Sequence, residues 1–127
     1  MQKIFRYLLS FFFIVAGIWH FVDPSFYYEL IPDYLPYPQT LNVLSGFLEV
    51  LFGFGILFST VRKWAATGIL LLLIAFIPSH IFFLQIGSCL ENGLCVAPWV
   101  AWVRLLIIHP LFLLWAWYVG FGLKRKS

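Results

Sequence analysis

The sequence predicts an all-α integral membrane protein, a four-helix bundle whose N- and C-termini both lie on the cytoplasmic side. Of its 127 residues, 63% are hydrophobic and only 10% are charged, and the mean hydropathy is +0.97. A soluble domain of this size could not bury so much apolar surface, whereas a bilayer accommodates it. Four long apolar runs and a one-sided distribution of lysine and arginine complete the prediction.

Each of the four apolar runs meets the requirement of about 20 residues for crossing a hydrocarbon core about 30 Å thick. Backbone groups in lipid must be satisfied within the segment, so each run is expected to be a helix. The expected helices cover residues 4–22, 41–59, 64–86 and 99–123 of a single domain, residues 1–127. The first run is not expected to be a signal peptide, because Trp19 and His20 stand near its end and no small-x-small cleavage site follows.

The basic residues fix the expected orientation. Seven of them fall on one side of the four-span map: Lys3, Arg6, Arg62, Lys63, Lys124, Arg125 and Lys126. The opposite side has no lysine or arginine, and its charged residues are all acidic: Asp23, Glu29, Asp33 and Glu91. The positive-inside rule then places both termini in the cytoplasm, in a multi-pass protein of the plasma membrane, or of the inner membrane if the source is bacterial. The net charge of +3 is a topology signal, and no nucleic-acid partner is expected.

Two loops are expected outside, covering residues 23–40 and 87–98. In the first, Asp23 and Pro24 are typical of an N-cap and a first helical residue, and they predict a short interfacial helix through residues 25–31. Its tyrosines suit the headgroup layer, which favours an anchor, and a lid over the outer mouth of the bundle is the alternative. In the second loop, Cys89 and Cys95 flank an Asn-Gly turn signal, which favours a structural disulfide over free thiols or a working redox pair.

Glu49 is the most informative residue, because it lies near the middle of an otherwise apolar span. A charged side chain at bilayer depth costs about 3 kcal/mol on insertion scales, so an intramembrane acid indicates a functional site. Asn42 and Ser45 precede it at helical spacing and share its stripe of the helix. Four residues of other spans are candidates to meet it in an outward-facing polar pocket: His20, His80, Arg104 and, less strongly, His109.

Each candidate also has a structural interpretation. Glu49 and Arg104 could form a buried ion pair that only fixes helix register. His20 could be an interfacial histidine, and His80 could satisfy carbonyls freed by Pro78. His109, five residues after Arg104 and roughly 140° away around a regular helix, is expected to pack between helices unless Pro110 distorts the turn. No metal site and no catalytic residue are expected, because metal-ligand spacing and a nucleophile–base pair are both missing from the sequence.

The order of these residues resembles the DoxX family of small four-helix membrane proteins over nearly the whole chain. The resemblance rests on Ala16-Gly17-x-x-His20-Phe21, Pro24, Tyr27, Ile31-Pro32, Leu35-Pro36, Ser45-Gly46-x-x-Glu49, Gly53, Arg62, Pro78 to His80, and Arg104. Two positions depart from the family pattern. His80 stands where the family has asparagine, and Ile107 to Pro110 stand where relatives often have proline and glutamine.

The resemblance implies a fold more firmly than a reaction. DoxX-like proteins are associated with thiosulfate:quinone oxidoreductase subunits, methylamine-utilisation proteins and oxidative-stress membrane complexes, and animal relatives act as receptor-assembly chaperones. We therefore expect an accessory subunit of a redox-linked membrane system, not an enzyme on its own, with a pocket for a quinone-like or other lipid-soluble ligand. The alternatives are a non-enzymatic assembly or scaffolding factor and a small proton-coupled transporter. The expected partners are the lipid bilayer, a membrane or redox protein, or a second copy of the chain.

Overall fold

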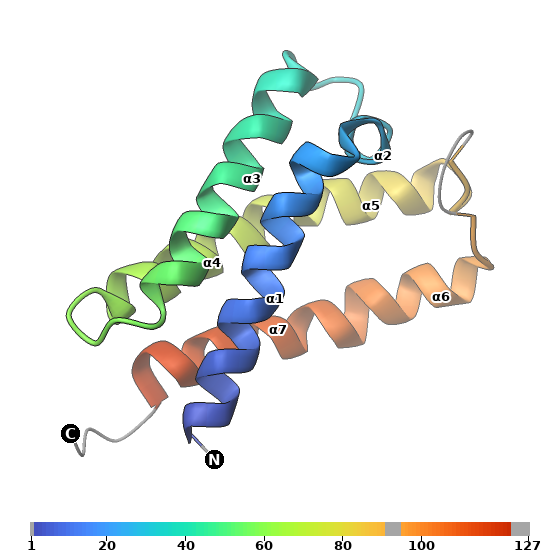
Figure 1. The fold of residues 1–127 in the computed structure, drawn as a ribbon. Coiled ribbons are helices and arrows are strands. Elements are labelled where there is room, and N and C mark those ends of the chain that lie inside the picture. Colours follow the sequence, from blue (N-terminus) through green and yellow to red (C-terminus); the bar gives the residue numbers. More distant parts are fainter. Residues whose placement is uncertain (1, 91–94, 123–127) are drawn as a thin grey trace.

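The computed structural model of the chain describes residues 2–90 and 95–122, and these residues fold almost entirely as helices (Figure 1). The first half contains α1 (Gln2–Val22), the short α2 (Pro24–Tyr28) and α3 (Pro38–Gly55). α4 (Arg62–Ala75) and α5 (Ile77–Gln85) follow. The last helix consists of four consecutive pieces, α6 (Pro98–Val103), the π-helical η1 (Arg104–Ile108), α7 (His109–Trp117) and the π-helical η2 (Tyr118–Gly122).

Three helical segments are long and apolar enough to cross a membrane: Lys3–Val22, Arg62–Gln85 and Pro98–Gly122. α3 is not among them, because Gln39, Asn42 and Glu49 lower the hydropathy of its 18 residues. α3 also begins and ends earlier than expected, at Pro38 and Gly55 instead of residues 41 and 59. The structure thus supports a membrane protein with three apolar spans, and a fourth span belongs to the proposal below.

α1 and α3 form the closest helix pair of the bundle and run side by side in Figure 1. Small residues at the contact make this approach possible: a Cβ atom on Gly17 would lie 2.7 Å from the Gly46 carbonyl oxygen, and one on Gly46 would lie 2.7 Å from the His20 Cβ. Ser10 Oγ donates a 2.7 Å hydrogen bond to the Gly53 carbonyl. Close backbone approach at small residues is the usual way in which helices associate in lipid.

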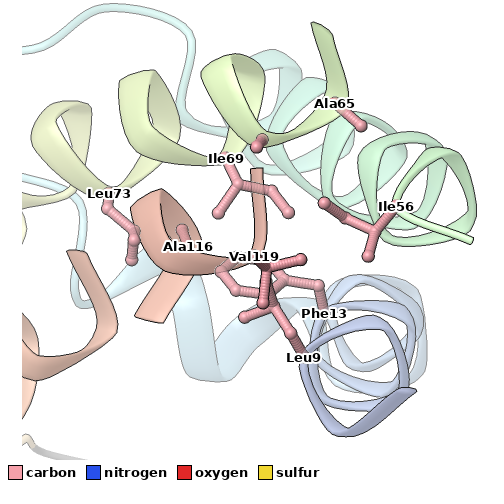
Figure 2. Packing of buried hydrophobic residues seen from close by; sticks show 9 residues of the cluster. Leu9, Phe13, Ile56, Ala65, Ile69, Leu73, Ala116 and Val119 are labelled. Carbon is pink, nitrogen blue, oxygen red and sulfur yellow. The ribbon is translucent and has the colours of Figure 1, made fainter. Parts of the chain in front are cut away.

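The main hydrophobic core lies near the chain ends and the α3–α4 turn. It joins side chains from α1, the residue after α3, α4, α7 and η2 (Figure 2): Leu9, Phe13, Ile56, Ala65, Ala66, Ile69, Leu73, Ala116 and Val119. Trp115 Nε1 donates a 3.1 Å hydrogen bond to the Phe5 carbonyl, and Arg62 Nε donates one of 2.8 Å to the Ile56 carbonyl. These contacts hold the start of α1, the α3–α4 turn and the end of the last helix at one end of the bundle.

Two irregular turns shape the opposite half. The regular α-helix is interrupted at Phe76, between α4 and α5, two residues before Pro78. In the last helix the His109 backbone N–H bonds to the Arg104 carbonyl, five residues earlier, immediately before Pro110. Proline lacks a backbone N–H, and single π turns are frequent at functional sites. Ser79 and His80 follow the first irregularity, and Arg104 begins the second; all three line the cavity described below.

Candidate functional site

A cavity of about 440 Å³ opens between the helices on the far side of the core. It is lined from α1, α2 and the segment after it, α3, α4, α5 and η1. All six residues predicted as pocket candidates lie around it: His20, Asn42, Ser45, Glu49, His80 and Arg104. Apart from Ser79, the remaining walls are aromatic and aliphatic, so a few polar groups face a largely apolar chamber, which is the usual composition of a small-molecule site.

His20, at the end of α1, is the centre of the polar group. It is buried within the bundle, with 5% of its surface exposed. Its backbone carbonyl would bond to the N–H of residue 24 in a continuing helix, but residue 24 is proline and has no N–H. Asn42 Nδ2 donates to that carbonyl instead, at 2.9 Å.

The same amide determines which ring nitrogen of His20 carries a proton. Because Asn42 Nδ2 donates to the His20 carbonyl, Asn42 Oδ1 is the atom that faces His20 Nδ1, 2.7 Å away. Flipping the amide would bring two oxygen acceptors together, so this orientation is fixed by chemistry. An amide oxygen only accepts, and His20 Nδ1 must therefore be the donor.

Glu49 meets the other nitrogen of the same ring. Its Oε2 lies 2.6 Å from His20 Nε2, and both side chains are buried. In neutral imidazole with a proton on Nδ1, Nε2 has only a lone pair, and a carboxylate at this distance would repel it. A contact this short is favourable only if one further proton is present, either on the carboxyl group or on the ring. In both cases the pair has no net charge.

Tyr27, from α2, covers the His20 ring. The two ring centroids are 3.7 Å apart and the planes differ by 14°, a stacked arrangement. Burial is the main cause that raises the pKa of Tyr27 to about 12, and the nearby charges of Glu49 and Asp23 add to it. The phenol therefore stays protonated at ordinary pH. The sequence left a headgroup anchor and a lid over the outer mouth as alternatives for this segment, and the structure places Tyr27 over the His20 ring.

The pairing of Glu49 with Arg104 that the sequence suggested does not form, because His20 reaches Glu49 first across the tight α1–α3 contact. The Arg104 guanidinium lies 5.0 Å from the centre of the Phe83 ring, a cation–π contact. Its Nε is buried without a hydrogen-bond partner, and among the residues that the structure describes no carboxylate lies within ion-pair distance of it.

His80 and His109 meet on the same side of the cavity as Arg104. Their rings contact at 4.6 Å between centroids, edge to face. His109 Nε2 donates a 2.7 Å hydrogen bond to the Leu73 carbonyl, so His109 links α7 to α4 and does not line the cavity. The π turn at Pro110 is the distortion that brings residues five apart toward one face. His80 Nδ1 is buried and has no partner in the described part of the chain.

The segment after α1 forms the outer wall. α2 spans Pro24–Tyr28, shorter than expected, and Asp23 makes no side-chain cap bond to it but accepts a 3.0 Å hydrogen bond from Ser25 Oγ. Four apolar residues of this wall line the cavity beside Tyr27: Phe26, Leu30, Ile31 and Leu35. The sequence analysis gave a lid over the outer mouth of the bundle as the alternative for this segment, without naming the residues that line the cavity. The sequence did contain a signal for the Asn42 contact. Proline stands four residues after His20, so the His20 carbonyl lacks its helical N–H partner and needs another donor.

Cys89 and Cys95 are joined by a disulfide bond, with the sulfur atoms 2.09 Å apart. The Val96 N–H bonds to the Ser88 carbonyl at 2.9 Å, so the two arms of the loop run antiparallel beside the bond. Residues 91–94, which include the Asn92-Gly93 turn signal, lie outside the described residues. The disulfide connects the end of α5 to the start of α6, the two helices that carry His80 and lead into Arg104.

Comparison with known proteins yields one family. No curated protein and no solved structure matches the chain. A family model described as "Domain of unknown function (DUF8561)" matches residues 9–120, from α1 to the last π-helical turn and thus across every residue of the cavity. The chain therefore belongs to the DUF8561 family.

Proposed function

We propose that this protein is a multi-pass membrane protein whose cavity binds a lipid-soluble molecule with an oxygen-bearing polar head, such as a quinone. One observation carries the proposal: two buried nitrogens, Arg104 Nε and His80 Nδ1, border an apolar cavity and have no partner among the described residues. Unpaired buried polar groups are costly, by about 1–3 kcal/mol each. An oxygen atom on the head of a bound ligand would pair with the Arg104 guanidinium, while the aromatic walls hold its apolar part.

The proposal includes four spans with both termini in the cytoplasm. α3 would be the fourth span, because its polar residues Asn42 and Glu49 are buried against α1 and the cavity. Its opposite face is apolar and exposed, and it would contact lipid: Val43, Leu44, Phe47, Leu51 and Phe54. The distribution of lysine and arginine supports the orientation. The cavity would then open toward the extracytoplasmic side, where the disulfide also lies.

A role as an accessory subunit of a redox-linked membrane system stays part of the proposal, as does kinship with DoxX proteins. Both rest on the order of residues from His20 to Arg104. A ligand-binding subunit of this kind needs no catalytic group of its own, because its partner would supply the chemistry. The cavity geometry is the part of the proposal that this chain can test by itself.

The test compares organic extracts of gently purified wild type, Ala75→Trp and Leu71→Trp by mass spectrometry. Ala75 lines the cavity, so a tryptophan there would fill it, whereas Leu71 is an exposed residue one turn earlier on the same helix. We expect a defined lipid-soluble molecule in wild type and Leu71→Trp and its loss from Ala75→Trp. If all three folded proteins carry the same molecules in the same amounts, the proposal is wrong, and an assembly factor becomes the better interpretation.

A further inference from the structure

The charges around the cavity lead to a narrower statement about its occupant. We propose that the cavity binds an anionic amphiphile together with one proton, with the anionic head beside Arg104 and the proton held between His20 and Glu49. This inference rests on the proposed function, because it needs the cavity to be a ligand site. It adds the charge of the ligand head and the group that compensates it.

Among the described side chains that border the cavity, Arg104 carries a positive charge without a counter-charge in contact with it. The contact between His20 Nε2 and Glu49 Oε2 requires a shared proton, and that pair is then neutral. Arg104 keeps its positive charge, and the described part of the chain offers it no carboxylate within ion-pair distance. Arg104 is half-buried, and a charge at membrane depth without a counter-charge is unfavourable, so a negatively charged head is the occupant that best complements this state.

Loss of the proton from the His20–Glu49 pair changes this charge balance. If the pair loses it, the Glu49 carboxylate becomes negative and faces the same cavity as Arg104. Glu49 and Arg104 then balance each other, and a second anion would be repelled. Charges interact more strongly in a low-dielectric interior than in water, so the two events are coupled without direct contact. Anion binding and protonation of the pair should therefore favour each other, and by linkage the effect is reciprocal.

The other groups around the pair do not provide an alternative counter-charge. From α2, Tyr27 stacks on His20 and remains a neutral phenol, and Asp23, just before α2, is not among the residues that line the cavity. From α5, His80 faces Arg104. From α4 and the residue after it, the lining residues are Leu72, Ala75 and Phe76, which do not titrate. Glu49 is therefore the acid through which the cavity can exchange a proton with its occupant.

The test uses decanesulfonate, because a sulfonate stays ionised at every working pH and any proton taken up must go to the protein. The wild-type protein is placed in nanodiscs of neutral phosphatidylcholine, and binding is measured by titration calorimetry from about pH 5 to pH 10, a range that brackets the ordinary pKa of histidine. Buffers of different ionisation enthalpy report the protons taken up. Decanol, which has the same chain length and no charge, is the matched neutral ligand.

We expect decanesulfonate to bind more tightly than decanol at low pH. Its Kd should rise by up to about tenfold per pH unit over the range in which the pair loses its proton, with up to one proton taken up per sulfonate. Decanol should show no such dependence. Equal binding of the two ligands, or a sulfonate Kd that does not change with pH, would overturn the inference and leave the proposed function standing.

Two variants separate the roles of the charges. Glu49→Gln keeps a donor toward His20 Nε2 and cannot lose a proton, so we expect decanesulfonate binding of wild-type strength at low pH that no longer weakens as pH rises. Arg104→Gln should lose the preference for decanesulfonate over decanol. A pH dependence that persists in Glu49→Gln contradicts the inference. If neither ligand binds wild type better than Ala75→Trp, the proposed function itself fails.

The anionic head could belong to a free amphiphile or to a membrane phospholipid. Repeating the titration in nanodiscs that contain phosphatidylglycerol distinguishes the two sources. Weaker apparent binding of decanesulfonate in those discs indicates that the phospholipid occupies the cavity. Unchanged binding indicates that the natural occupant is a free acidic amphiphile.

Discussion

His20 Nε2 lies 2.6 Å from Glu49 Oε2, and this contact joins the end of α1 to the middle of α3 inside the bundle. Asn42, two turns before Glu49 on the same face of α3, holds the opposite side of the ring. One imidazole thus receives a fixed donor role on Nδ1 and a shared proton on Nε2. The arrangement depends on how closely the two helices approach, and several consequences can be measured.

Gly46→Ala should disturb this approach. The added Cβ would lie 2.7 Å from the His20 Cβ and 2.9 Å from the Gly17 carbonyl oxygen, so the helices must separate or the histidine must move. Overpacking of this kind typically destabilises by about 1–3 kcal/mol. Thermal unfolding in detergent should show a lower Tm for Gly46→Ala, whereas Val43→Ala on the exposed face of α3 should unfold near the wild-type temperature. Equal Tm values for all three would contradict the packing described for α1 and α3.

Asn42→Ala should remove two buried hydrogen bonds at once, those to His20 Nδ1 and to the His20 carbonyl. The carbonyl cannot recover a helical partner, because residue 24 is proline. We expect a loss of stability of about 1–3 kcal/mol from the unsatisfied groups, measured by chemical unfolding. Thr67→Ala is the control, because its hydroxyl bonds to the Lys63 carbonyl on an exposed surface. A loss no larger than that of Thr67→Ala would show that Asn42 does not hold His20.

The stacked tyrosine gives the protein a defined response to alkali. The pKa of Tyr27 is about 12 in the folded protein, raised first by burial, against an ordinary value of 10.0. The folded state therefore holds the phenol proton more tightly than the unfolded state does. Stability from this group is fully present below about pH 10 and is lost as pH rises toward 12.

Absorbance of ionised tyrosine, followed during alkaline titration, measures this directly. Tyr27→Phe should remove one late-titrating phenol from the wild-type curve and leave the earlier part unchanged. The Tm of the wild type should also fall more steeply between pH 10 and pH 12 than that of Tyr27→Phe. If Tyr27→Phe instead removes a phenol that titrates near pH 10, Tyr27 is not buried over His20.

Reduction of the Cys89–Cys95 bond should loosen the connection between α5 and α6. A disulfide that closes so short a loop stabilises by about 2 kcal/mol on the chain-entropy estimate. We expect the double variant Cys89→Ser with Cys95→Ser to unfold at a lower temperature than the oxidised wild type and to be insensitive to reducing agent. Wild type treated with the reductant should match the double variant. An unchanged Tm on reduction would show that the bond does not contribute to the fold.

Much of the fold and most of the site could be predicted from the sequence. Apolar runs of sufficient length predict helices because lipid leaves the backbone no other partners. Glu49 and Arg104 stand out by their charge, and Asn42 and Ser45 follow from helical spacing with Glu49. All of these residues border the one cavity described above. The charged and polar residues of an apolar chain are few, so a bundle tends to gather them.

The partner of Glu49 could not be predicted in the same way. Depth along a helix allows both His20 and Arg104 to reach it, and only the close contact at Gly17 and Gly46 decides between them. The place of His109 depends on a π turn, which hydrophobic periodicity does not reveal. Tyr27 covers the ring because α2 turns back over the bundle, a tertiary relationship that the loop sequence does not encode locally.

The protonation state of the two His20 ring nitrogens tests the central claim of this account most directly. Nitrogen NMR of protein labelled at histidine, with His20→Gln to identify the resonance, reports which ring nitrogens carry protons. We predict a protonated Nδ1 at all accessible pH values, together with an Nε2 signal that is strongly hydrogen-bonded and changes on Glu49→Ala. A His20 ring with a bare Nδ1 and an Nε2 signal indifferent to Glu49 would contradict the arrangement from which the cavity's function was derived.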